Sequence, residues 1–307
     1  MTDDILVSIG ELAHRTGLAV RTVRFYCDEG ILESRRSAGG HRLFDADRAT
    51  ERLLLVRRLR ALGLGLDSIT EVLRGERSMA EAIAAESARL DLEFRSLAWR
   101  RASVRAVETA APTQRAERLA LLAAAQDSGA VHDCLARFWQ RVLAPVPRHE
   151  VDRWVCWNVP EPPADPSVDE VVALAELSAL VADPELSAAV RQQLWRYRPE
   201  VIRDRQGLYF DVGDLMPDVV ALVSAGERPH DGSELDRYVK AHARARGERD
   251  SLRFRRQLLV GATDADHRIH RYWALTGQLL GARITVGPTH HWLYDALADS
   301  IASAPRA

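Results

Sequence analysis

The stretch SIGELAHRTGLAVRTVRFYCDEGIL, residues 8–32, decides the fold of the first part of the chain. Ser8 followed three residues later by Glu11 is a capping box, in which two side chains satisfy backbone N–H groups at the start of a helix. Gly17 can adopt a positive φ and ends that helix. A second helix is predicted over residues 19–29. Two short helices joined by a glycine turn form a helix-turn-helix.

The residues that follow predict a wing and two more helices. Gly39 and Gly40 stand between two short extended segments, an arrangement typical of a hairpin tip. A third helix is predicted from Asp45, a good N-cap residue, to the glycine turn at residues 63–65. A further short helix is predicted over residues 67–74.

Charge is unevenly distributed along the chain. Between residues 15 and 60 there are eleven arginines and six acidic residues, although the whole chain has a net charge of -2. A local excess of positive charge suits DNA, because DNA affinity depends on neutralising phosphates. A solvated charged face is the alternative, since arginine dominates the basic residues everywhere and Lys240 is the only lysine.

In order and spacing, this part of the chain resembles the MerR family of transcription regulators. The matching pieces are Ile9 to Ala13, Thr16-Gly17, Thr22 to Tyr26, Gly30 to Leu32, Gly40 to Arg42 and Leu59 to Leu66. The resemblance implies a winged helix-turn-helix DNA-binding domain over residues 1–76. It places the second helix in the major groove of double-stranded DNA and the wing against the flanking backbone.

The resemblance also implies which residues contact DNA. They are Arg21, Thr22, Arg24, Phe25 and Tyr26 on the second helix, with Arg36, His41 and Arg42 on the wing. Arginine can form paired hydrogen bonds with guanine or phosphate, whereas threonine and tyrosine hydroxyls mainly bind phosphates. Core packing of Phe25 and Tyr26 is the alternative, as is an ion pair between Arg24 and Asp28.

Three residues depart from the family pattern. Phe25 stands where tyrosine is frequent, and His41 stands where an aromatic tyrosine is more typical. Ala19 replaces the usual serine cap, which should cost the second helix about 1 kcal/mol. These departures affect individual contacts and leave the expected fold unchanged.

A long helix is predicted over residues 77–110. Apolar residues recur there every seven positions, namely Ile83, Leu90, Leu97 and Val104. This interval predicts one seam of a coiled coil, although the companion seam is poorer. Packing on the same chain is an alternative, but MerR-like regulators pair such helices antiparallel. The helix is therefore predicted to form a homodimer that reads a palindromic promoter site.

Residues 111–307 predict a mainly helical domain, so the fold class expected for the chain is mainly α. Helical apolar spacing occurs at 114–126, 130–143, 168–181, 185–197, 214–224, 233–258 and 264–280. Strands remain an alternative around Trp154 to Val159, Gly207 to Val212 and Arg283 to Val286.

Aromatic residues of this domain suggest a pocket for a small organic effector. The candidates are Trp139, Trp154, Trp157, Tyr272, Trp273, His291 and Trp292. Aromatic surface with a few polar donors suits a planar ligand, although core packing is the commoner role of tryptophan.

Four histidines raise the alternative of a metal site. His267 and His270 lie three residues apart on a predicted helix, and His290 or His291 could supply a third ligand. Histidines are more often structural, and the cysteine pair of metal-sensing relatives is absent from the sequence. No metal and no cofactor are therefore expected.

These patterns predict a dimeric regulator that acts with RNA polymerase at a promoter and is not an enzyme. No nucleophile elbow, phosphate loop, zinc-hydrolase motif or dinucleotide fingerprint occurs. A ligand-independent repressor or architectural protein is the main alternative, and an enzyme domain joined to a DNA-binding head is a weaker one. Neither a signal peptide nor a membrane span is evident, so the cytoplasm is expected.

Overall fold

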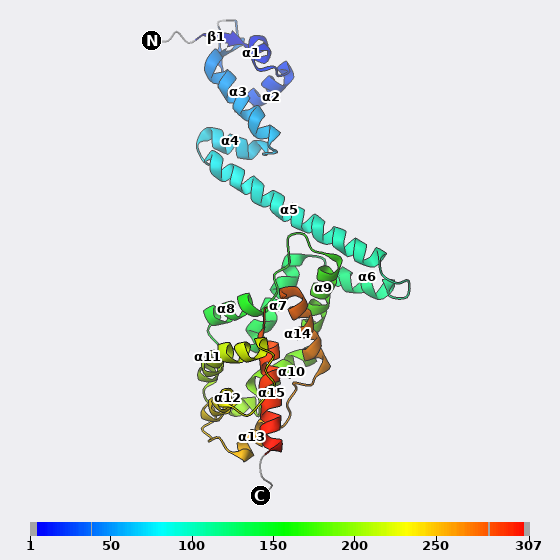
Figure 1. The fold of residues 1–307 in the computed structure, drawn as a ribbon. Helices are drawn as coiled ribbons and strands as arrows, with labels where there is room; N and C mark the ends of the chain where they lie inside the picture. Colours follow the sequence, from blue (N-terminus) through cyan, green and yellow to red (C-terminus); the bar gives the residue numbers. More distant parts are fainter. Residues whose placement is uncertain (1–4, 38, 282, 304–307) are drawn as a thin grey trace. The chain divides into compact units, whose positions relative to one another are not determined.

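The computed structural model describes residues 5–37, 39–281 and 283–303 (Figure 1). Within these ranges the chain forms fifteen α-helices, one 3-10 helix and one three-stranded sheet. The prediction of a mainly α fold is confirmed. None of the helices in the described ranges is long and apolar enough to cross a membrane. The chain divides into two compact units, Met1–Phe94 and Arg95–Ala307.

The first unit is a small helical domain with a three-stranded antiparallel sheet. Its elements are β1 (Leu6–Ser8), α1 (Ile9–Thr16), α2 (Val20–Asp28), β2 (Arg35–Arg36), β3 (Arg42–Asp45), α3 (Ala46–Ala61) and α4 (Leu66–Arg74). The strand order is β1-β3-β2, and Val7 lies opposite Phe44. Strand β1 was not predicted from the sequence, because three residues are too few to show an alternating pattern.

The helix ends follow the predicted caps with one change. The Ser8 side chain accepts a hydrogen bond of 3.3 Å from the Glu11 backbone N–H. The Glu11 carboxylate does not complete the capping box and instead pairs with Arg15. Gly17 adopts the predicted left-handed conformation, with φ 67°. Ala19 provides no side-chain cap for α2, because its methyl group cannot accept a hydrogen bond.

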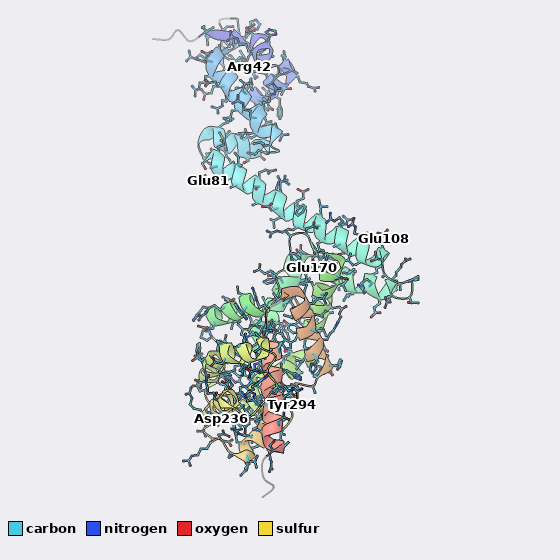
Figure 2. All side chains as sticks on the ribbon, in the orientation of Figure 1. Arg42, Glu81, Glu108, Glu170, Asp236 and Tyr294 are labelled. Carbon is cyan, nitrogen blue, oxygen red and sulfur yellow. The ribbon has the colours of Figure 1, made fainter. Side chains whose placement is uncertain are left out.

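Two apolar clusters hold the first unit together. Leu12, Val23, Phe44 and Leu53 are buried in the first cluster, which joins α1, α2, α3 and the sheet. The second joins α3 and α4 to Ala82, near the start of α5 (Met79–Glu108). Reciprocal hydrogen bonds between Ser78 and Glu81, which is labelled in Figure 2, begin α5. This helix continues past the boundary between the two units.

The second unit consists of helices alone within its described residues. They are the carboxy-terminal part of α5, then α6 (Arg115–Ala124), α7 (Ser128–Val142), α8 (Arg148–Asn158), α9 (Val168–Ala182), α10 (Pro184–Trp195), η1 (Pro199–Val201), α11 (Arg205–Ser224), α12 (Ser233–Arg244), α13 (Leu252–Leu259), α14 (His267–Leu280) and α15 (Val286–Ala302).

Helix α9 is the centre of the larger core of this unit. It packs against α6, α7 and α14, and residues on several of its faces are buried, including Val171, Val172 and Leu174. A helix that is apolar on several faces requires neighbours on several sides. A second core joins α11, α12, α13 and α15. Val212 of α11 packs against both cores, so the two are adjacent.

Strands were an alternative for three segments. Two of these segments are helical, and the third leads into a helix. Trp154 to Asn158 end α8, Gly207 to Val212 belong to α11, and Val286 begins α15. The segment predicted as one helix over 233–258 is divided between α12 and α13. Gly247, with φ 70°, lies in the turn that separates them.

Candidate DNA interface and ligand pocket

Helix α2 presents most of its side chains to solvent. Val23 is its only buried residue, whereas Arg21 and Arg24 are exposed. Phe25 is 48% exposed and therefore does not fill the core. Tyr26 is partly buried and packs against both clusters of the first unit. The exposed face of α2 thus carries two arginines and an aromatic ring.

Asp28, at the end of α2, connects this helix to the wing. Its carboxylate accepts a 2.9 Å hydrogen bond from Arg42 of β3 and does not pair with Arg24. This hydrogen bond and the nearby negative charge raise the pKa of Arg42. Within the described ranges, Arg24 forms no ion pair. No ion pair among the described residues therefore competes with a contact of Arg24 to DNA.

The wing is a short hairpin with a polar tip. The Ser37 N–H donates to the His41 carbonyl over 2.9 Å, and Gly40 has φ 80°. Arg36 and His41 are exposed, and Thr22 of α2 is partly buried. Ala38, which precedes Gly39 in the sequence, lies outside the described residues. The wing and α2 together carry all the residues predicted to contact DNA.

The apolar residues at seven-residue intervals along α5 are exposed. Ile83 is 40%, Leu90 48%, Leu97 59% and Val104 61% exposed. Leaving four large apolar side chains in water along one helix is unfavourable, since burial of each stabilises by about 1.5–3 kcal/mol. This face of α5 is therefore available for another helix.

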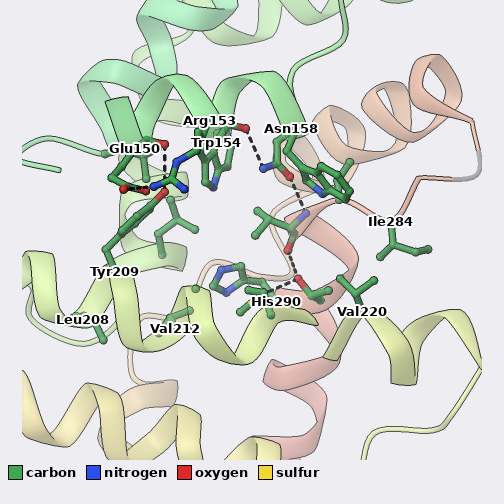
Figure 3. A pocket seen from close by; sticks show the side chains of 18 of the residues that line it. Glu150, Arg153, Trp154, Asn158, Leu208, Tyr209, Val212, Val220, Ile284 and His290 are labelled. Carbon is green, nitrogen blue, oxygen red and sulfur yellow. Dashed lines mark hydrogen bonds and ion pairs between the residues drawn. The ribbon is translucent and has the colours of Figure 1, made fainter. Parts of the chain in front are cut away.

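A pocket of about 320 Å³ lies in the second unit between its two cores. Its walls come mainly from α8, α10, α11 and α15. Figure 3 shows Trp154 and Asn158 of α8 across the pocket from Val212 and Val220 of α11. The residues that line it are Leu143, Glu150, Arg153, Trp154, Trp157, Asn158, Leu194, Trp195, Leu208, Tyr209, Val212, Gly213, Met216, Val220, Ile284, Thr285, Val286, Thr289 and His290.

Two of the seven predicted effector residues, Trp154 and Trp157, line this pocket. Trp139 and Tyr272 are fully buried and joined by a 2.7 Å hydrogen bond from Trp139 Nε1 to the Tyr272 hydroxyl. The Trp139 ring lies 4.0 Å from that of Trp154, so these residues form the support behind the pocket wall.

The other three predicted effector residues also lie outside the pocket lining. Trp273 packs against Trp139, with ring centroids 5.6 Å apart. Trp292 belongs to the second core and donates to the Glu227 carbonyl. His291 is exposed and lies 3.6 Å from Asp295. The structure thus separates these three side chains from one another.

His290 is one of several polar residues of the pocket that were not predicted as effector residues. Its side chain lies on α15 and is visible within the pocket in Figure 3. The residue is 3% exposed, and its Nδ1 atom has no hydrogen-bond partner among the described residues. An unpaired buried polar atom costs about 1–3 kcal/mol. Nδ1 has almost no accessible surface, so Nε2 is the ring nitrogen that a molecule in the cavity could reach. Nothing in the sequence distinguished His290 from the adjacent His291 and Trp292 as the residue that lines the pocket.

Behind His290 lies a buried ion pair between Arg196 and Asp264. Arg196 donates to both carboxylate oxygens of Asp264, and the distance from Nη2 to Oδ1 is 3.0 Å. Arg196 Nε also donates to the Tyr238 hydroxyl over 2.7 Å. Gln193 also donates to Asp264 over 3.1 Å. Both charged side chains are completely buried. The hydrogen bonds between these two side chains compensate for the free energy lost when their charges are removed from water.

Burial lowers the pKa of His290 to about 4, and the nearby Arg196 charge acts in the same direction. His290 is therefore neutral at pH 7 in the folded protein. In the unfolded chain a histidine titrates near pH 6.5. Between these two values the unfolded state binds more protons, so stability must fall as the pH is lowered from 6.5 towards 4.

We expect His290→Gln to reduce this pH dependence. In urea unfolding at pH 7 and pH 4.5, the variant should lose about 2–3 kcal/mol less stability than the wild type on acidification. His242 is also buried with its pKa lowered well below 6.5, so part of the dependence should remain. His267→Gln is the control, because the His267 side chain is 89% exposed. Equal losses in wild type and His290→Gln would contradict the assignment.

The four histidines considered for a metal are not gathered around one point. His267 is exposed, His290 is buried, and the His270 and His291 rings lie 5.2 Å apart. Across the described ranges, no group of three or more histidine, cysteine, aspartate or glutamate residues is arranged to hold a metal ion.

Comparison with known proteins agrees with the geometry of the first unit. The profile of the MerR HTH family regulatory proteins matches residues 7–76. Nodulation protein NolA of Bradyrhizobium elkanii is 37% identical over 86 residues, which are 28% of this chain and 39% of NolA. The SoxR homologue of Chromobacterium violaceum, an HTH-type transcriptional activator, is 32% identical over 95 residues, which are 31% of this chain and 64% of that protein.

The family profile covers residues 7–76, and each of these relatives aligns with less than a third of this chain. The matched region spans less than two thirds of each of these relatives, and no solved structure matches the chain. Within residues 7–76, the capped helix α1, the exposed helix α2 and the hairpin wing occur in the order that the sequence predicted. Residues 7–76 of this chain are a MerR-family helix-turn-helix domain.

Proposed function

We propose that this chain is a homodimeric DNA-binding transcription regulator that responds to a small organic ligand. The observation that carries the proposal is the face of α2, where Arg21 and Arg24 are exposed over a single buried residue, Val23. The similarity to the SoxR homologue, an HTH-type transcriptional activator, supports the regulatory role. In this proposal, residues 1–76 bind DNA, 77–110 pair the two copies and 111–307 bind the ligand.

In the proposed complex, α2 enters the major groove and the wing contacts the flanking backbone. Arg24 is unpaired within the described ranges and can form two hydrogen bonds to one guanine. Thr22 and Tyr26 hydroxyls fix the register on phosphates, together with Arg36 and His41 of the wing. Arg42 supports the wing through Asp28 and has remaining donors for phosphate.

We expect Arg24→Ala to weaken binding to the preferred DNA site by about 1–3 kcal/mol, because one paired contact to a base is lost. Binding to a random duplex should change much less. Fluorescence anisotropy at fixed salt with both duplexes measures the two affinities. Arg228→Ala, which removes an exposed arginine of the second unit, is the control. Equal weakening on both duplexes would assign Arg24 to phosphate instead.

Two copies would pair through the exposed apolar face of α5. Leu90 and Leu97 are about half exposed in a single chain and would be buried between two helices. A two-fold axis through such a pair requires a palindromic DNA site, because each copy reads one half.

The ligand would act by binding one arrangement of the dimer more tightly than another, since only differential affinity can shift such an equilibrium. A change in the angle between the two DNA-binding domains would bend and untwist the promoter, bringing its elements into register for RNA polymerase. Bending a short site costs about 1–6 kcal/mol, which contacts from both domains can offset.

Selection of binding sites from a random duplex library tests the proposal. Full-length protein should enrich a two-fold symmetric sequence, and this site then serves as the probe for effectors. Enrichment of no sequence above background would contradict sequence-specific regulation. DNA binding that no ligand of the pocket affects would favour the alternative, a ligand-independent repressor or architectural protein.

A further inference from the structure

We propose that the pocket between α8, α11 and α15 binds an uncharged, flat aromatic molecule whose single hydroxyl or N–H group forms a hydrogen bond with His290. This inference rests on the proposed ligand-responsive function and specifies the chemistry of its ligand. It is carried by the lining of the pocket, by the His290 ring, which has no hydrogen-bond partner among the described residues, and by the pairing of the charges around it.

The walls of the pocket suit a flat aromatic ligand. Trp154, Trp195 and Tyr209 provide aromatic surface from three different helices. Aliphatic side chains, including Val212 and Val220 of α11, form part of the remaining lining. Aromatic rings attract other rings in offset and edge-to-face arrangements, beyond the gain from burial alone. A cavity of about 320 Å³ can hold a compact two-ring molecule rather than a long chain.

Several polar groups in the pocket already have partners, whereas no hydrogen bond within the described ranges involves the indole N–H of Trp154 or Trp157 or the Thr285 hydroxyl. Asn158 donates from Nδ2 to the Trp154 carbonyl and accepts from the Val286 N–H over 3.0 Å. The Thr289 hydroxyl donates to the Val286 carbonyl over 2.8 Å. Neither ring nitrogen of His290 forms a hydrogen bond among the described residues; Nδ1 has almost no accessible surface, so Nε2 is the nitrogen that a ligand can reach. A ligand that places one hydrogen-bonding group at His290 therefore supplies a partner that this side chain lacks.

The charges of the site disfavour an ionised ligand. Glu150 and Arg153 line the pocket and pair with each other, so their charges offset each other and favour neither an anionic nor a cationic ligand. The buried charges behind His290, on Arg196 and Asp264, are likewise paired. His290 itself is neutral at pH 7 because burial lowers its pKa to about 4. A neutral hydroxyl or N–H group is the partner that a neutral imidazole binds without adding a buried charge.

Isothermal titration calorimetry of the full-length protein with three matched probes tests this inference. The probes are naphthalene, 2-naphthol and 2-naphthoate, which share one ring system and differ only in a single substituent. We expect 2-naphthol to bind about 3- to 10-fold more tightly than naphthalene, because one added hydrogen bond increases the affinity by about this factor. The charged 2-naphthoate should bind more weakly than 2-naphthol. Equal affinity for naphthol and naphthalene, tightest binding of naphthoate, or no binding of any probe would overturn the proposal.

Variants at His290 assign the preference to this residue. His290→Phe should bind naphthalene as before and lose the preference for 2-naphthol, whereas His290→Gln should retain part of it. His267→Phe, at an exposed position of α14, should behave as the wild type. An unchanged preference in His290→Phe would contradict the assignment.

Two glycine variants locate the binding site. Gly213 lines the pocket with open space around the position of a side chain, so Gly213→Phe should fill the pocket and abolish binding of all three probes. Gly277 of α14 has equal space but lies outside the pocket lining, so Gly277→Phe should bind normally. Binding that survives Gly213→Phe would place the ligand elsewhere.

Binding of the selected DNA is measured on the same preparation to separate the two proposals. Normal DNA binding without a preference for 2-naphthol overturns the ligand chemistry alone. Probe binding without specific DNA binding overturns the proposed regulatory function and leaves the ligand chemistry supported.

Discussion

Leu90→Glu should weaken dimerisation by about 3–6 kcal/mol, because each dimer would lose two leucines from the interface at about 1.5–3 kcal/mol each. Leu90 lies on the exposed apolar face of α5 and is 48% exposed in the single chain. The fold of each chain should therefore survive the substitution. Sedimentation velocity over a concentration series should show the variant as a monomer where the wild type is a dimer.

Ala88→Glu provides a matched control, because Ala88 is also exposed but lies two residues away, on the opposite side of the helix. This variant should dimerise as the wild type does. A monomeric wild type, or equal effects of the two substitutions, would contradict pairing through this face of α5.

Asp264→Asn should reduce the free energy of unfolding by about 3–5 kcal/mol, because it leaves the Arg196 charge buried without a counter-charge. Arg196 and Asp264 are both completely buried and form an ion pair. Gln193 also donates to this carboxylate, so the substitution disturbs more than one hydrogen bond. Urea unfolding of wild type and variant at pH 7 measures the difference.

Asp218→Asn is the control for the loss of one carboxylate charge. Its partner is Arg237, and both side chains are about half exposed. Removal of such a surface pair should cost at most about 1 kcal/mol. A small effect of Asp264→Asn, similar to that of the control, would show that water or another group reaches Arg196.

The fold of the first unit could be predicted because its signals are local. Ser8 begins α1, Gly17 ends it and Asp45 caps α3, and each acts within a few residues of its own position. The strand β1 could not be predicted, because its pairing with β3 joins residues far apart in the sequence. The ion pair between Asp28 and Arg42 likewise depends on how the wing folds back onto α2.

The pocket was predicted only in part, because it depends on how four distant helices pack. Trp139 and Trp154 were both reasonable candidates by composition, yet only Trp154 lines the cavity, while Trp139 supports it from behind. His290 and His291 are neighbours in the sequence, but their side chains leave α15 in directions that differ by about one hundred degrees. One is buried at the pocket and the other is exposed, a difference that the surrounding helices determine.

The most direct test of the account is a hydroxyl-radical footprint of the full-length protein on its selected DNA site. The account predicts protection that is mirrored about a central two-fold axis, with one α2 and one wing on each half. Arg24→Ala should weaken both halves equally. Protection of a single, asymmetric segment by one copy would contradict a dimeric regulator that reads a palindrome.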